Sequence, residues 1–248
     1  MRTALCSFAF ASLTVAALPA LAAPAVKNLA FDRLGEYRTG AFDESAAEIA
    51  AYDPATARVF VTNSASGALD VLDITDPAHP VRVMTLDVTG YGGAPTSVAA
   101  RGGIVAVAVP AAVRTDPGTM VFFDAQGQVQ AHVAVGALPD MLTFTPNGRF
   151  VLVANEGEPS DDYLTDPPGS VSVIRVPADL GTLGAQHVRT ADFTAFDATG
   201  APAGVRGFGP GASPAQDLEP EYITVAGDSR TAWVSLQEKN ASGRLDVE

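Results

Sequence analysis

PDMLTFTPNGRFVLVANE, residues 139–156, reads as two short apolar strands joined by a tight turn. The same pattern occurs in residues 47–64, AEIAAYDPATARVFVTNS, and in residues 220–238, PEYITVAGDSRTAWVSLQE. A more divergent copy, TSVAARGGIVAVAVP, begins at Thr96. In the three clear copies an acid precedes the first strand, and the second strand ends in Asn or Gln. Short alternating runs bounded by turn residues predict an all-β chain.

The spacing of these copies indicates a repeated four-stranded unit. The units begin near residues 47, 96, 139 and 220, and the last interval contains a long insertion at residues 177–218. In each of the first three units, two further strand-like runs follow the two-strand pattern. Four strands at a period in the forties are typical of a β-propeller blade. A β-sandwich is the alternative fold, but it does not require an internal repeat.

The last unit is predicted to be incomplete. Residues 241–248, ASGRLDVE, break the pattern, because Ser242-Gly243-Arg244 is a poor start for a strand. A closed propeller needs at least four blades, whereas this chain supplies three units and about half of a fourth. We therefore predict a β-propeller domain over residues 23–248, with about three and a half blades present, as expected of a truncated product.

The N-terminus predicts export from the cytoplasm. Met1 and Arg2 are followed by an apolar stretch and by the small-residue site Ala20-Leu21-Ala22. This order is that of a secretory signal peptide, predicted over residues 1–22 with cleavage near Ala22 and Ala23. The mature chain is then extracytoplasmic, whether periplasmic, secreted or at the cell surface. It contains no cysteine after Cys6, so disulfides contribute nothing to the mature domain.

Composition restricts the partners of the chain. The formal net charge is -13, and an acidic surface of this kind repels nucleic acids and anionic membranes. The mature sequence predicts no membrane span. A protein or small-molecule partner, or a cation, is what such a surface favours. About 225 mature residues are enough for one domain with a sizeable core.

Propeller topology gathers many of the polar residues on one face. The start of the first strand and the end of the second strand of each blade share an end of the sheet, called here the top face. The candidate metal ligands predicted there are Glu48, Asp140, Glu156, Glu158 and Glu221. The candidate ligand-binding residues are Asn63, Arg114, Asn155, Arg206, Gln237 and Glu238.

Carboxylate and amide oxygens in this arrangement are typical ligands of Ca²⁺, which takes six to eight oxygens. The alternative is that the acids only accept hydrogen bonds from neighbouring backbone, repeating because the blade repeats. Asp161, Asp162 and Asp166 are assigned to a solvated loop. Arg58, Arg149 and Arg230 fall at turns on the opposite, bottom face, where we interpret them as solvated charges.

The residues also resemble a known family. RVFVTNSASGALDVLDI resembles a bacterial YVTN-type propeller repeat. Four longer motifs resemble the choice-of-anchor I proteins: LGEYRTGAFDESAAEIAAYDPAT, LVANEGEPSDD, GVRGFGPGASPAQDLEPEYITV and SLQEKN. The resemblance covers residues 34–240. It implies an exported bacterial β-propeller, of a kind described as alkaline-phosphatase-like or mesenchyme-specific surface-glycoprotein-like, without implying a particular reaction.

Two functions follow as hypotheses. The first is a non-catalytic exported scaffold that binds a ligand, cation or protein on its acidic top face, and the lack of any catalytic signature favours it. No Gly-x-Ser-x-Gly occurs, and the histidines are isolated from one another. The second, which the resemblance implies, is a cation-dependent phosphoesterase. There the candidate metal ligands would hold the metals, and Arg114 and Arg206 would bind phosphate oxygens.

Overall fold

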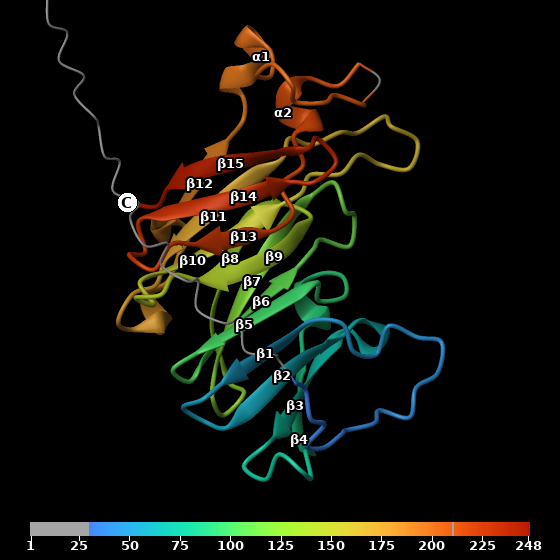
Figure 1. Cartoon of the computed structure of the whole chain (residues 1–248), viewed down its shortest axis with the longest axis vertical. Helices are drawn as coiled ribbons and strands as arrows, with labels where there is room; N and C mark the ends of the chain where they lie inside the picture. The colour runs from blue at the N-terminus through green and yellow to red at the C-terminus, as the bar shows by residue number, and fades with distance from the viewer. Residues whose placement is uncertain (1–29, 210) are drawn as a thin grey trace, which may run out of the picture. The chain divides into compact units, whose positions relative to one another are not determined.

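The computed structural model describes residues 30–209 and 211–248, and the predicted signal peptide at residues 1–22 lies outside them. Within this part, strands β1 to β15 form four antiparallel sheets (Figure 1). Their bounds are β1 Ala50–Asp53, β2 Arg58–Asn63, β3 Ala68–Asp73, β4 Val81–Asp87, β5 Ser97–Arg101, β6 Ile104–Val109, β7 Pro117–Asp124, β8 Val129–Ala137, β9 Pro139–Phe144, β10 Phe150–Asn155, β11 Ser170–Arg175, β12 Val188–Asp192, β13 Ile223–Val225, β14 Thr231–Leu236 and β15 Ala241–Asp246.

The sheets reproduce the predicted repeat. Strands β1 to β4, β5 to β8 and β9 to β12 each form a four-stranded sheet in chain order, and β13 to β15 form a three-stranded one. Each sheet begins where a repeat begins, so the all-β prediction and the assignment of strands to units are confirmed.

Helical segments are few and short in the described residues. The α-helices are α1 (Ala195–Thr199) and α2 (Pro214–Asp217), both in the insertion between β12 and β13. The 3-10 helices are Ser64–Ser66, Thr89–Tyr91, Leu180–Thr182 and Ala185–His187. Ser213 caps α2 by accepting a hydrogen bond from Gln216 N–H, and the Gln216 side chain bonds back to Ser213 N–H, which fixes this short helix.

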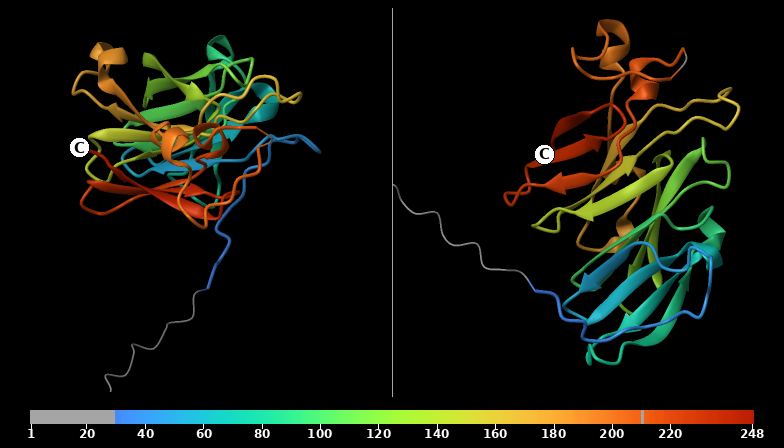
Figure 2. Two further views of the ribbon diagram at one scale, coloured as in Figure 1. Left: turned by 90° about the horizontal axis from the view of Figure 1, so that it is seen from above. Right: turned by 45° about the vertical axis from the view of Figure 1, so that its right-hand side comes forward.

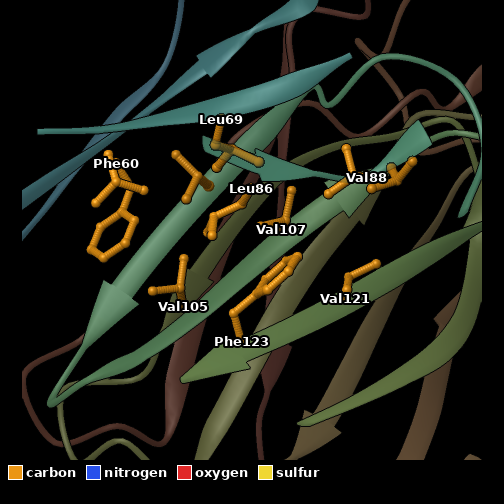
Figure 3. Close-up of a cluster of buried hydrophobic side chains, with 11 residues drawn as sticks. Phe60, Leu69, Leu86, Val88, Val105, Val107, Val121 and Phe123 are labelled. Atoms are coloured by element: carbon orange, nitrogen blue, oxygen red, sulfur yellow. The ribbon is translucent and has the colours of Figure 1, made fainter. Parts of the chain in front are cut away.

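Apolar side chains pack between successive sheets. Figure 3 shows the cluster between the first and second sheets, where Phe60 and Leu69 meet Val105 and Phe123. A second cluster lies between the second and third sheets, and a third between the third and fourth. Successive side chains of a strand point to opposite faces of its sheet, so one strand contributes to two clusters. In β6, Val105 belongs to the first cluster and Ala106 to the second. Burying each large side chain contributes about 1.5–3 kcal/mol.

The first strand of each sheet contacts the first strand of the next. The pairs β1 and β5, β5 and β9, and β9 and β13 are all in contact, as expected of inner strands in a propeller-like arrangement. Asp53, at the end of β1, reinforces the first of these junctions. Its buried carboxylate accepts hydrogen bonds from Gly102 N–H at 3.0 Å and Gly103 N–H at 2.9 Å, in the turn of the second sheet.

Two predictions about this fold are wrong. Residues 241–246 do form a strand, because β15 pairs with β14 along its whole length and places Gly243 opposite Val234. Backbone pairing to a formed neighbour outweighs the poor intrinsic propensity of Ser and Gly. Among the turn arginines, Arg58 is not simply solvated, because its guanidinium donates to Ala125 O of the next sheet. Arg149 and Arg230 are exposed as predicted, and Arg149 Nη1 lies 2.9 Å from Glu248 Oε1.

Candidate ligand-binding site

The loop between β10 and β11, residues 156–169, starts with a backbone conformation that requires glycine. Gly157 has φ +73°, and a Cβ there would lie 2.8 Å from Gly169 N. Glu156 N–H donates to Leu138 O at 2.9 Å, and Gly157 N–H to Ala137 O at 3.2 Å. This sharp turn, fastened to the junction of β8 and β9, sets the positions of Glu156 and Glu158 on either side of Gly157.

The insertion between β12 and β13 folds back beside that loop (Figure 2). Gln216 Nε2 donates to Asp166 O at 2.7 Å, and Gly169 N–H donates to Ala215 O at 3.0 Å. Both bonds link α2 to the end of the loop. Two segments that are about fifty residues apart in sequence therefore form one wall.

Asp217 and Lys239 hold the insertion against the fourth sheet. Lys239 Nζ lies 3.1 Å from Asp217 Oδ1 and 3.0 Å from Glu219 Oε2, and its side chain is only 3% exposed. Burial disfavours the charged ammonium, but hydrogen bonds to Glu219 and Asp217 outweigh it and raise the pKa of Lys239. Asp217 also accepts hydrogen bonds from the backbone N–H groups of Phe208 and Gly209.

These segments enclose a pocket of about 490 Å³, called here the acidic pocket. Two cationic side chains line it, those of Arg114 and Lys239, and Arg114 is paired with Glu158. The exposed aromatic side chains of Tyr163 and Phe208 also line it. The carboxyl groups in its walls are those of Glu156, Glu158, Asp161, Asp166, Asp217, Glu219 and Glu238.

Burial, and then the charge of neighbouring carboxyl groups, raises the pKa of some of these acids. Burial, followed by the charges of Glu158 and Asp140, raises the pKa of Glu156 from its ordinary value of 4.5 to about 8. Burial also raises the pKa of Asp166, with a further contribution from Asp217. One oxygen of Asp166, Oδ1, is buried without a hydrogen-bond partner in the described residues. Such an oxygen is unusual in proteins and is a natural place for a ligand donor.

The structure brings some of the predicted site residues to this pocket and places others elsewhere. Glu156, Glu158, Arg114 and Glu238 line it. Asp140 and Glu221 lie near enough to affect the pKa of Glu156 but are not in its walls. The remaining five predicted residues, described next, are not in its walls either: Glu48, Asn63, Asn155, Arg206 and Gln237.

Three of these five form contacts within their own sheets or segments. Glu48 accepts a hydrogen bond from Ser64 Oγ at 2.9 Å in the first sheet. Asn63 Nδ2 donates to Asp70 at 3.2 Å, and its Oδ1 accepts from Ser66 N–H. Arg206 lies over the Phe208 ring, with Cζ 5.4 Å from the centroid.

The other two do not point to the pocket. Asn155 is fully buried and donates to Ser170 Oγ and Ser172 Oγ of β11, at 3.2 and 2.9 Å. Gln237 is exposed beyond the end of β14. A position at the end of the second strand of a sheet is therefore not enough to place a side chain in the pocket walls.

Sequence reasoning missed residues that the pocket depends on. The prediction of a solvated loop is wrong for Asp166, because its Oδ1 is buried, whereas Asp161 is exposed as predicted; both line the acidic pocket. Of that group, Asp162 is the residue that shapes the loop, accepting from Ser160 Oγ at 2.7 Å and Leu164 N–H at 3.1 Å. The repeat pattern does not point to Lys239 or Asp217. The signal for Lys239 was its rarity, since the sequence contains only two lysines.

The acidic side chains of the described residues do not form a metal centre. Among residues 30–209 and 211–248, no group of three or more Asp, Glu or His side chains is arranged to hold a metal ion. Of the five predicted calcium ligands, Asp140, Glu158 and Glu221 thus lie near enough to Glu156 to affect its pKa, without forming a coordination shell with it. Glu48 lies apart, hydrogen-bonded to Ser64. In the same part of the chain, no helix is long and apolar enough to cross a membrane.

Solved structures support the fold. A functionally unknown protein from Desulfotomaculum acetoxidans DSM 771 matches with TM-score 0.55 and 13% identity, covering 82% of this chain and 55% of that one. A "putative 6-phosphogluconolactonase" from Bacteroides uniformis ATCC 8492 matches with TM-score 0.52 and 9% identity, covering 81% of this chain and 50% of that one. This chain therefore spans about half the length of these two structures.

The family of the chain is shown by its sequence. No curated protein matches it. The model of the choice-of-anchor I domain matches residues 48–248, which include all four sheets and the acidic pocket. The chain belongs to the choice-of-anchor I family, a family of exported bacterial surface proteins.

Proposed function

We propose that the acidic pocket binds a cationic ligand, and that the chain is a non-catalytic binding domain of an exported surface protein. The observation that carries this proposal is the excess of negative charge in the walls. Seven carboxyl groups line the pocket, whereas Arg114 and Lys239 are its cationic side chains. A cation entering the pocket would be attracted by this excess of negative charge. It would also supply the favourable interactions that the carboxylates lose when burial removes their hydration.

The state of individual groups supports the same proposal. Asp166 Oδ1 is buried without a hydrogen-bond partner in the described residues, and the raised pKa values of Glu156 and Asp166 both have burial as their main cause. Carboxylates held in this way are destabilised until a positive group approaches them. An ammonium group or a hydrated metal ion has the charge to do so.

A more specific form of the proposal is that the cationic ligand is calcium. Its preference for carboxylate oxygens fits the residue types of the pocket, but the side chains would have to move toward a common centre to coordinate it. An organic polyamine would not require a coordination shell. Binding of calcium and binding of a polyamine can be compared in the same assay.

No observation favours the phosphoesterase alternative. Arg114, one of the two residues expected to bind phosphate, is paired with Glu158. Arg206, the other, lies over Phe208 and outside the pocket walls. A phosphate group would also meet the seven carboxyl groups, whose negative charge disfavours it.

Isothermal titration calorimetry with calcium chloride and, separately, with spermidine at pH 8 tests the proposal. We expect saturable binding of at least one cation, and a loss of about tenfold in affinity for Asp166→Asn, because a charge-assisted contact is removed. Glu44→Gln, which removes an exposed acid outside the pocket, is the matched control. Absence of heat and of any shift in melting temperature with both cations would contradict the proposal. Binding of spermidine without any binding of calcium would exclude calcium as the ligand of the acidic pocket.

A further inference from the structure

A second charged pocket lies at the other end of the third sheet. It has a volume of about 510 Å³ and is called here the basic pocket. Its walls are formed by Arg149, Phe150, Arg175, Gln186, His187, Arg189 and Glu248. Arg149 precedes β10, Arg175 ends β11 and Arg189 lies in β12, so three neighbouring strands contribute an arginine at the same end.

The positive charge of this pocket is only partly balanced. Three guanidinium groups line it against one side-chain carboxylate, that of Glu248, on a chain whose formal net charge is -13. Arg175 forms no ion pair within the described residues.

The chain already places an oxyanion in this pocket. Glu248 Oε1 lies 2.9 Å from Arg149 Nη1, and its other oxygen lies 3.9 Å from Arg230 Nε. Arg189 Nη2 donates to Val247 O at 2.7 Å, which fixes the adjoining backbone beside β12. Arg149 and Arg230 thus already hold one carboxylate that lines this pocket.

Glu248 is a weakly held occupant. The side chains of Arg149 and Glu248 are 58% and 41% exposed, and ion pairs this accessible to water contribute little to stability. An external oxyanion could therefore displace Glu248 without disturbing the sheet. A ligand with two or more oxyanion groups would also reach Arg175 and Arg189, whose planar guanidinium forks match carboxylate and phosphate geometry.

We propose that the basic pocket is a second binding site, for a small molecule bearing several carboxylate or phosphate oxyanions, with Glu248 as its internal competitor. This proposal does not depend on cation binding in the acidic pocket. The two pockets have no lining residue in common, and they have opposite charge.

Calorimetric titration of the whole chain with sodium citrate and, separately, with sodium phosphate tests the site and distinguishes the two sources of oxyanion. Glu248→Gln should bind the preferred anion about three- to tenfold more tightly than wild type, because the competing carboxylate is removed. Arg175→Ala should bind it about tenfold more weakly. Arg175 has no ion pair to lose in the described residues, so this variant should fold normally.

Arg244→Ala is the matched control, since Arg244 is an exposed arginine of β15 outside the basic pocket. It should leave anion binding unchanged. Three outcomes would overturn the proposal: no binding of either anion by wild type and Glu248→Gln, no gain in affinity on removing the Glu248 carboxylate, or equal losses for Arg175→Ala and Arg244→Ala. The last result would indicate attraction by overall charge instead of a site.

Discussion

Lys239 Nζ and Asp217 Oδ1 lie 3.1 Å apart, and this buried pair joins the insertion between β12 and β13 to the end of the fourth sheet. Glu219 Oε2 completes the arrangement at 3.0 Å from the same ammonium. One buried cation therefore pairs with two acids that come from the segment preceding β13. Neither strand packing nor the repeat requires this contact, so it belongs to the pocket and not to the propeller-like framework.

Lys239→Met should destabilise the chain by about 3–5 kcal/mol, because it leaves Asp217 and Glu219 buried without a counter-charge. The pKa of Lys239 is raised above its ordinary value of 10.5, so its stabilising charge is present at neutral pH and is lost only above that value. Urea unfolding at pH 7 measures the change. Arg244→Met is the control for an exposed cation, and equal stability of the two variants would contradict the assigned role.

Asp53→Ala should lower the free energy of unfolding by about 2 kcal/mol, because it leaves two backbone N–H donors of the next sheet without their buried acceptor. Gly102 and Gly103 are those donors. Glu44→Ala removes an exposed carboxylate and should change stability little. Thermal and urea unfolding compare the two. A loss as small as that of the control would show that the junction of β1 and β5 does not depend on Asp53.

Gly157→Ala should distort the loop of residues 156–169 at a cost of about 1–3 kcal/mol, because φ is +73° and the added Cβ would meet the backbone of residues 167–169. It should also weaken cation binding to the acidic pocket, since Glu156 and Glu158 would move. Gly227→Ala is the matched control, because a Cβ there has no neighbour within 4 Å. Unfolding and calorimetry on both variants separate the loop effect from glycine removal in general.

Cation binding to the acidic pocket should strengthen as pH rises from about 6 to 8. The pKa of Glu156 is about 8, so at lower pH a cation must displace its proton. Glu156→Gln should bind cations more weakly above pH 8 and should lose most of this pH dependence. Spermidine titrations at pH 6, 7, 8 and 9 measure it. A wild-type profile as flat as that of the variant would contradict the raised pKa.

The carboxyl group of Glu156 should also make the free energy of unfolding fall as pH rises. Because its folded pKa of about 8 exceeds its ordinary value of 4.5, its contribution is fully present below pH 4.5 and is lost as pH rises toward 8. Glu156→Gln should therefore be more stable than wild type at pH 8.5 and similar at pH 4. Each pKa unit corresponds to about 1.4 kcal/mol, and partial solvent exposure reduces the expected gain to about 2 kcal/mol. Urea unfolding at both pH values tests the sign.

The strands, their grouping into four units and the approximate position of the acids could be predicted from the sequence. Alternation of apolar residues is a local property, and β2, β10 and β14 each form where the repeat predicts them. Prediction failed where a strand depends on its neighbour. β15 has weak intrinsic propensity and forms because β14 offers a complete row of partners.

The sequence by itself determined that acids would follow β10, and only the tertiary structure decided which of them act together. Asp166 lines the pocket because α2 bonds to the loop that contains it, whereas Asn155 is turned to Ser170 and Ser172. Lys239 holds the pocket together because its two partners, Asp217 and Glu219, come from the segment between β12 and β13. Charge, burial and pKa are set by groups that meet only after the sheets have packed, and no local pattern encodes which groups those are.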